Sequence, residues 1–316
     1  MKALQKTAIS AAAVALLTGL STVSFAADEP AAEVEVSPIT ANVTVASSYI
    51  YRGITQSNNK PAIQGGFDYA HESGFYVGNW NSSISWISDA YNNAGNTNGP
   101  KNSAPSTSAP IEMDFYAGFK KEFLGEGFAS DFGVLQYYYP TTGLGGIQSK
   151  AWVTANPSMR QTSGVNPSTT ELYAAQNFTF GPVTGFGKFS YAVSNLFGIQ
   201  NSAGSFYPDL TANYDTGFYG ITVNAHVGYQ YVPNNVVSTT AQVTGAGNSA
   251  SQAGTWNASY ADWKLGLTKD FGGGLSGTAY YTGTSAQKVG STYVYATPNG
   301  GNAGRGNAVV ALTKTF

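Results

Sequence analysis

Nine ionisable side chains are candidates for selecting solutes, because they fall on one face of segments in which apolar and polar residues alternate. They are Arg52, Asp68, Glu112, Asp114, Glu171, Lys188, His226, Asp262 and Lys264. Alternate side chains of a strand point to opposite faces, and a Lys or Arg facing lipid near the membrane midplane costs roughly 2–4 kcal/mol. If these segments cross a membrane, all nine are therefore expected to line the interior. There they would either select solutes by charge and hydrogen bonding or form a salt-bridge network that fills the space.

Catalytic chemistry is not expected from the two histidines. His71 and Ser73 have the spacing of the His and Ser of outer-membrane phospholipases, but the sequence places them in a short periplasmic turn. Hydrolysis of that type works near the outer leaflet. His226 has Gly228 two residues later, where that arrangement needs Ser, and it is expected to face inward. The chain is predicted to be no enzyme.

Metal and cofactor motifs are weak. Glu112 and Asp114 share a strand face, but two carboxylates are too few to specify a cation. Gly272–Gly274 lacks the Lys and Ser/Thr of a phosphate-binding loop and is predicted to be a turn. The absence of Cys excludes thiolate ligands and disulfides. Tyr137–Tyr139 could stack on sugars or belong to an aromatic girdle. We expect no metal and no cofactor.

The first residues indicate export. Lys2 and Lys6 precede an apolar stretch from Ile9 to Leu20, which ends in Ser24-Phe25-Ala26. This pattern predicts a signal peptide at 1–26, cleaved between Ala26 and Ala27. A membrane anchor is the alternative, but a spanning helix needs about 20 apolar residues. Residues 27–38 are predicted to be a flexible periplasmic lead, and 39–316 the folded part.

Composition favours a sheet protein that faces lipid on one side and water on the other. Charged residues make up 10% of the chain, against about 25% in a typical soluble domain. Gly (38), Tyr (21) and Phe (17) are abundant. Without Lys2 and Lys6, 13 basic and 17 acidic residues remain, a net charge of −4, which is unlike a nucleic-acid binder.

The clearest strand is predicted over 219–231. Its apolar face carries aromatic residues at both ends and aliphatic residues between them, as expected for a lipid-facing band with aromatic girdles. Similar alternation recurs around 39–49, 63–69, 111–120 and 262–267. Segments 75–86 and 128–139 change parity midway, so a bulge or a misjudged boundary is expected there.

The connections sort by length and predict the topology. Five short Gly-bearing turns lie at 72–74, 124–127, 181–183, 215–217 and 272–274. Six longer polar stretches, expected to be solvated loops, lie at 53–60, 87–110, 140–168, 197–205, 232–257 and 284–304. Their alternation predicts a transmembrane antiparallel β-barrel of twelve strands, with short turns and both termini in the periplasm and long loops outside.

The last predicted strand, 307–316, has alternate apolar residues and a terminal Phe316. This resembles the β-signal that the barrel-assembly machinery recognises, so that machinery is an expected partner. Lys314 departs from the apolar face, and near the interface its ammonium can extend into water.

The segment after the first strand resembles a known family. Tyr51-Arg52-Gly53-Ile54-Thr55-Gln56 is followed by the segment 60–69, then by Phe75-Tyr76-Val77-Gly78 and Trp80. This is similar to the TorF-type porin family, a proteobacterial group of conserved hypothetical proteins (Gcw_chp). The similarity is tight over about 40–86 and looser at 113–118 and the last strand. It implies an outer-membrane barrel of the Gram-negative envelope with a porin role, and it supplies no catalytic residues.

Two functions follow as expectations. The first is a porin-like channel through which a small polar solute diffuses passively, with lipid and that solute as partners and no nucleic acid. The second is a non-conducting barrel that serves adhesion, surface interaction or outer-membrane structure. Twelve strands lie between the eight that side chains can fill and the sixteen that leave an aqueous channel, so strand number does not decide between them.

Overall fold

The computed structural model describes residues 37–92, 108–142, 166–199, 201–233, 257–289 and 292–316. The predicted signal peptide and nearly all of the predicted lead lie outside these residues. The described chain is almost entirely β-structure. Its wall consists of β1 (Ile39–Ala46), β4 (Ala62–Ala70), β5 (Phe75–Ser83), β6 (Ile111–Glu122), β7 (Ala129–Tyr138), β8 (Thr169–Phe180), β9 (Val183–Ala192), β10 (Phe206–Asp215), β11 (Ile221–Gln230), β12 (Tyr260–Gly272), β13 (Leu275–Thr284) and β16 (Asn307–Thr315).

Short elements lie in the longer connections. They are β2 (Ile50–Tyr51), β3 (Ile54–Thr55), α2 (Trp86–Asn92), the 3-10 turn η2 (Leu196–Gly198), β14 (Lys288–Val289) and β15 (Thr292–Tyr293). No helix in the described ranges is long and apolar enough to cross a membrane.

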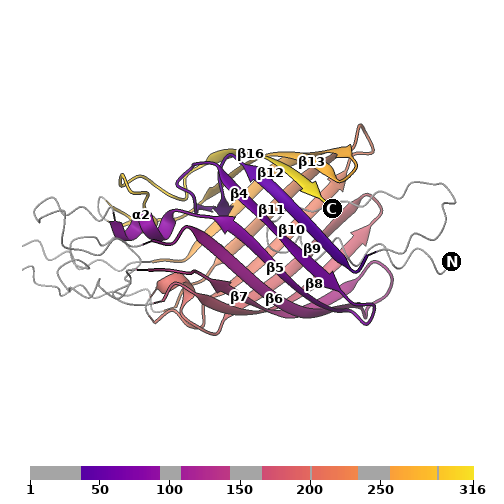
Figure 1. The fold of residues 1–316 in the computed structure, drawn as a ribbon, viewed down its shortest axis with the longest axis horizontal. Coiled ribbons are helices and arrows are strands. Elements are labelled where there is room, and N and C mark those ends of the chain that lie inside the picture. The colour runs from indigo at the N-terminus through magenta and orange to yellow at the C-terminus, as the bar shows by residue number, and fades with distance from the viewer. Residues whose placement is uncertain (1–36, 93–107, 143–165, 200, 234–256, 290–291) are drawn as a thin grey trace, which may run out of the picture.

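The twelve wall strands form one closed antiparallel barrel, in which β1 pairs with both β4 and β16. The predicted strand number is therefore confirmed. Closure pairs every strand on both sides, which leaves no open sheet edge to face hydrocarbon. The strands are strongly tilted, and the C-terminal end of β16 lies at the end that carries the short turns (Figure 1).

Strand alternation separates two surfaces. On β11, Val227 and Tyr229 are exposed on the outside, whereas Asn224 and Gln230 are buried inside. The same division holds on β12, where Leu265 and Leu267 are exposed and Asp262 is buried. An apolar exterior around a polar interior is the arrangement of a transmembrane barrel.

Aromatic residues gather on the outside at both ends of the barrel. Tyr138 and Tyr191 are exposed near the long loops, and Phe180 and Phe271 are exposed near the short turns. Aromatic rings favour the membrane interface, because one edge can contact acyl chains while the other meets water and headgroups.

Inward-facing tyrosines lie along the wall against glycines of neighbouring strands. The ring of Tyr76 covers Gly118 on β6, and the ring of Tyr207 covers Gly228 on β11. A Cβ atom at either glycine would overlap the tyrosine. These glycines therefore let the rings lie flat, with the hydroxyl groups reaching neighbouring carboxylates.

The bulge expected in 75–86 or 128–139 is wrong, whereas a misjudged boundary is confirmed for 75–86, because β5 ends at Ser83 and α2 begins at Trp86. Residues Phe75–Ser83 pair one by one with β6, and Ala129–Tyr138 with β6 without a shift. The polar residues that suggest a shift, Asn79 and Gln136, simply face outward. Their amides bond to nearby backbone carbonyls, Asn79 to Asp114 and Gln136 to Tyr137 and Thr169. Such bonds reduce the cost of an outward amide.

The last strand agrees with its predicted bounds. Lys314 lies on the outer face near the turns, where its ammonium reaches the carbonyl of Gly273 and lies 5.4 Å from the centre of the Phe316 ring. The aliphatic part of the side chain can thus remain against apolar surface while the charge is satisfied.

We predict that Leu265→Arg lowers the free energy of unfolding from lipid by about 2–4 kcal/mol, because position 265 is outward and mid-strand. Phe271→Arg is the matched control on the same face, since charge at an interface costs only about 0–1 kcal/mol. Denaturant unfolding in liposomes measures both. Equal losses at the two positions would contradict the assigned membrane depth.

Candidate functional site in the barrel lumen

The first long connection folds into the barrel. Residues 47–61 join β1 to β4, and β2 pairs with β3 to form a hairpin whose tip is Arg52-Gly53. Both tip residues have positive φ (45° and 74°), which suits a two-residue hairpin turn. Ile54, Thr55 and Gln56 are buried. The expectation of a solvated loop at 53–60 is therefore wrong, because polar residues here bond inside the protein.

The hairpin tip is tied to distant strands. The guanidinium of Arg52 donates to both carboxylate oxygens of Glu171 on β8, at 3.0 and 2.8 Å, and to Oε1 of Gln230 on β11 at 2.6 Å. β8 and β11 each lie four strands away from the strands that carry the hairpin. Arg52 therefore reaches across the lumen from the hairpin. The prediction that Arg52 lies on a wall strand is wrong, because it lies at the tip of the β2–β3 hairpin.

Aromatic rings enclose this ion pair. The guanidinium carbon of Arg52 lies 4.9 Å from the centre of the Tyr51 ring and 4.1 Å from that of Tyr207. Side-chain exposure is 7% for Arg52 and 2% for Glu171. Removal of one partner from a buried bidentate pair strongly destabilises the folded protein, because the other charge is left buried and unpaired. We call the Arg52–Glu171–Gln230 set the latch.

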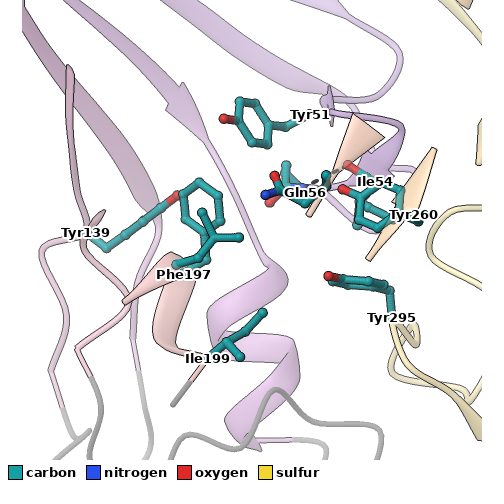
Figure 2. A pocket seen from close by; sticks show the side chains of 10 residues that line it. Tyr51, Ile54, Gln56, Tyr139, Phe197, Ile199, Tyr260 and Tyr295 are labelled. Atoms are coloured by element: carbon teal, nitrogen blue, oxygen red, sulfur yellow. Dashed lines mark hydrogen bonds between the residues drawn. The ribbon is translucent and has the colours of Figure 1, made fainter. Parts of the chain in front are cut away.

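A small cavity adjoins the latch at the loop end of the lumen. Figure 2 shows side chains of the hairpin, of β12 and of the loops around it. Its volume of about 20 Å³ is room for roughly one water molecule. Its lining residues are Tyr51, Ile54, Gln56, Tyr139, Leu196, Phe197, Ile199, Gln230, Tyr260 and Tyr295.

Edge-to-face aromatic contacts hold this region together. Phe197 on η2 lies 5.6 Å from the ring centre of Tyr51 and 5.0 Å from that of Tyr137. The hydroxyl groups of Tyr51 and Tyr137 share a hydrogen bond of 2.6 Å. The hairpin and η2 together therefore narrow the lumen at its loop end. We call this packed region the seal.

Acidic side chains lie just inside the seal. Glu112 accepts hydrogen bonds from the hydroxyl groups of Tyr49 at 2.5 Å and Tyr139 at 2.6 Å. Asp114 faces inward two residues later on β6, with Trp80 and Tyr137 as its cross-strand neighbours. Glu112 and Asp114 are 2% and 1% exposed.

His226 sits between two carboxylates. Its Nδ1 lies 3.0 Å from Oδ1 of Asp209, and its Nε2 lies 3.0 Å from Oδ2 of Asp262. Asp262 also accepts a hydrogen bond of 2.8 Å from Tyr207. Only the imidazolium can donate from both ring nitrogens, so this arrangement matches a charged His226.

Two further carboxylates, Asp68 and Asp131, lie nearer the turns, whereas Lys188 and Lys264 pair across strands with Asp209 and His226. Tyr76 donates to Asp131 at 2.6 Å, and Tyr116 donates to Asp68. Lysine ammonium groups lie over tyrosine rings, Lys188 at 4.6 Å from the centre of Tyr173 and Lys264 at 5.4 Å from that of Tyr280. Aromatic faces attract cations, so these rings hold the lysines against the wall.

The structure places the eight other predicted lumen residues on wall strands, facing inward. Three of them take part in the ion pairs described above. Glu171 belongs to the latch, and His226 lies within hydrogen-bond distance of Asp262. Lys120, Asp131 and Asp209 face inward too and were not predicted. The signal for Asp131 is its neighbour Phe132, an apolar residue that lies on the outer face and so indicates that Asp131 faces inward. The polar Gln136 lies on the same outer face, and this interrupts the alternation of apolar and polar residues.

The tyrosine run divides between the two faces. Tyr138 is 46% exposed on the outer surface, as a girdle residue would be, while Tyr137 and Tyr139 are buried in the seal. His71 and Ser73 lie in the β4–β5 turn, where Nδ1 and Oγ are 2.8 Å apart, and both are exposed. Among the described residues, no three His, Cys, Asp or Glu side chains lie close enough to hold a metal ion.

Comparison with known proteins identifies a family. The model of a bacterial protein family of unknown function, Gcw_chp, matches residues 27–316. No curated protein matches the chain.

Several solved structures share part of this backbone arrangement. The KdgM porin is 5% identical, with a TM-score of 0.45 over 88% of this chain and 98% of that one. The KdgM porin in complex with disordered oligogalacturonate is 6% identical, with the same TM-score and coverage. Acinetobacter baumannii OccAB1 is 10% identical, with a TM-score of 0.43 over 90% of this chain and 66% of that one.

We predict that the latch keeps the hairpin inside the lumen. The chain has no Cys, so Thr55→Cys, at a position 6% exposed, reports hairpin opening through its rate of maleimide labelling. Glu171→Gln should raise that rate by about tenfold or more, because the buried Arg52 loses its counterion. Lys60→Cys, at an exposed position of the same connection, is the control and should label at one rate in both backgrounds. An unchanged rate at position 55 would show that the latch does not hold the hairpin.

Proposed function

The chain belongs to the Gcw_chp family, and we propose that it is an outer-membrane porin-like channel for passive diffusion of small polar solutes. The observation that supports this most is the contrast between the two faces of the barrel. The outside is apolar, whereas the inside carries charged and hydrogen-bonding side chains along its length. A lumen of this kind lowers the cost for a polar solute to cross the membrane.

The location follows from export and fold. A signal peptide at 1–26, removed before Ala27, would deliver the chain to the periplasm, and the barrel would insert in the outer membrane. The short turns and both ends of the described chain would then face the periplasm. The strand that ends at Phe316 would engage the barrel-assembly machinery.

The lumen charges favour cations. Among the described residues, seven inward carboxylates are largely buried: Asp68, Glu112, Asp114, Asp131, Glu171, Asp209 and Asp262. Against them stand the four inward cations Arg52, Lys120, Lys188 and Lys264, together with His226. The net charge of these twelve groups is −3, or −2 with His226 protonated. An acidic lumen concentrates cations and repels anions.

The aromatic packing of the seal narrows the loop end of the lumen, so the seal would limit the conductance. The cavity in this region has room for roughly one water molecule, which is too little for a hydrated solute. Solute would pass when the hairpin moves, and the latch would determine how often that occurs.

The packed seal also supports a second candidate. If the hairpin stays in place, the barrel does not conduct, and the protein would act in adhesion, surface interaction or outer-membrane structure. The two candidates differ in one measurable property, the conductance of the reconstituted barrel.

We predict that the refolded protein produces discrete current steps in planar bilayers. In a KCl gradient, the reversal potential should show a preference for K⁺ over Cl⁻, because the lumen is acidic. Glu112→Gln with Asp114→Asn should lower that preference. An absence of steps above background would overturn the channel and leave the non-conducting barrel. Unchanged reversal potentials would show that residues 112 and 114 do not face the permeation path.

A further inference from the structure

Asp114 is a buried carboxylate with an oxygen atom that accepts no hydrogen bond from the described residues. Its side chain is 1% exposed, and Oδ1 finds no hydrogen-bond donor among the described residues. Glu112 accepts from two tyrosines, and Glu171 from Arg52. In the described chain, Asp68 and Asp131 each leave Oδ2 without a partner, but their Oδ1 atoms accept from tyrosine hydroxyl groups. An unpaired buried carboxylate is costly, so a donor carrying positive charge would stabilise this position.

The surroundings of Asp114 add negative charge. Glu112 lies two residues away on the same face of β6, and it accepts rather than donates. Arg52 uses both terminal nitrogens on Glu171 and Gln230. The local field therefore favours a cation from outside the protein.

Aromatic rings frame the same position. Trp80 on β5 and Tyr137 on β7 are the direct cross-strand neighbours of Asp114. The ring of Tyr49 meets that of Trp80 edge to face at 5.4 Å, and all three rings belong to one packed cluster. Aromatic surface attracts organic cations and contacts their alkyl groups.

We propose that Asp114 is the anchor of a subsite for the primary ammonium group of a small alkylammonium solute. The ammonium would donate N–H bonds to Oδ1 of Asp114, and the alkyl part would lie against Trp80 and Tyr137. A quaternary ammonium or K⁺ cannot donate such bonds, so neither satisfies Oδ1 as well. Tyr139, which donates to Glu112, also lines the cavity of Figure 2, so the subsite lies next to the seal. The inference rests on the proposed function for the route by which solute arrives.

Binding can be measured without conductance. The full-length protein, refolded in detergent, is titrated calorimetrically with ethylammonium chloride, tetramethylammonium chloride and KCl at matched ionic strength. Ethylammonium should bind saturably and more tightly than the other two. Asp114→Asn should weaken it by about tenfold or more, because a charge-assisted bond is lost. Asp131→Asn, another inward aspartate change, is the matched control and should retain binding. Trp80→Leu should weaken binding about threefold through loss of the cation–π contact.

The outcomes separate the subsite from the channel. Absence of saturable ethylammonium binding, equal affinity in Asp114→Asn, or equal affinity for tetramethylammonium each overturns the subsite. If Asp114→Asn fails to refold, as judged by its gel mobility with and without heating, Trp80→Leu decides, and unaltered affinity there overturns the proposal. Binding without conductance supports the subsite and refutes the channel, whereas conductance without binding does the reverse.

Discussion

Charged side chains cannot face hydrocarbon without a large cost, and the rest of this structure depends on that constraint. It requires the ionisable residues that lie at membrane depth on the twelve strands to point into one closed space. Backbone groups meet a related requirement through closure, since β1 pairs with β16 as well as β4. The outside is left to aliphatic residues between two zones of aromatic rings. The polar interior is thus a consequence of the solvent that surrounds the barrel.

Charges collected in a narrow lumen must then be paired with one another. Tyrosines do much of this, because their rings lie flat on glycines and their hydroxyl groups reach carboxylates such as Asp131. His226 pairs with two carboxylates, those of Asp209 and Asp262. The latch differs from these contacts, because it ties a loop to the wall across the lumen. A single arginine on a two-residue turn thus joins the first long connection to β8 and β11.

Local patterns in the sequence were sufficient to predict the strand number and the inward position of eight of the nine candidates. Turn length and side-chain parity are properties of neighbouring residues, so they can be read without knowing the fold. The latch could not be predicted in this way, because Arg52 and Glu171 are 119 residues apart and meet only in the closed barrel. The parity errors in β5 and β7 have another cause. Asn79 and Gln136 face outward by their position in the strand, and their bonds to backbone carbonyls make this tolerable, which no alternation of residue types reveals.

The central claim is that the Arg52–Glu171 ion pair holds the hairpin across the lumen and limits passage. Charge reversal tests it most directly, by comparing the single-channel conductance of Arg52→Glu, Glu171→Arg and the double variant. Each single change places like charges together and should open the seal, so conductance should rise, whereas the double variant restores opposite charges and should return towards the wild-type value. Conductance that is the same in all four proteins would contradict the account.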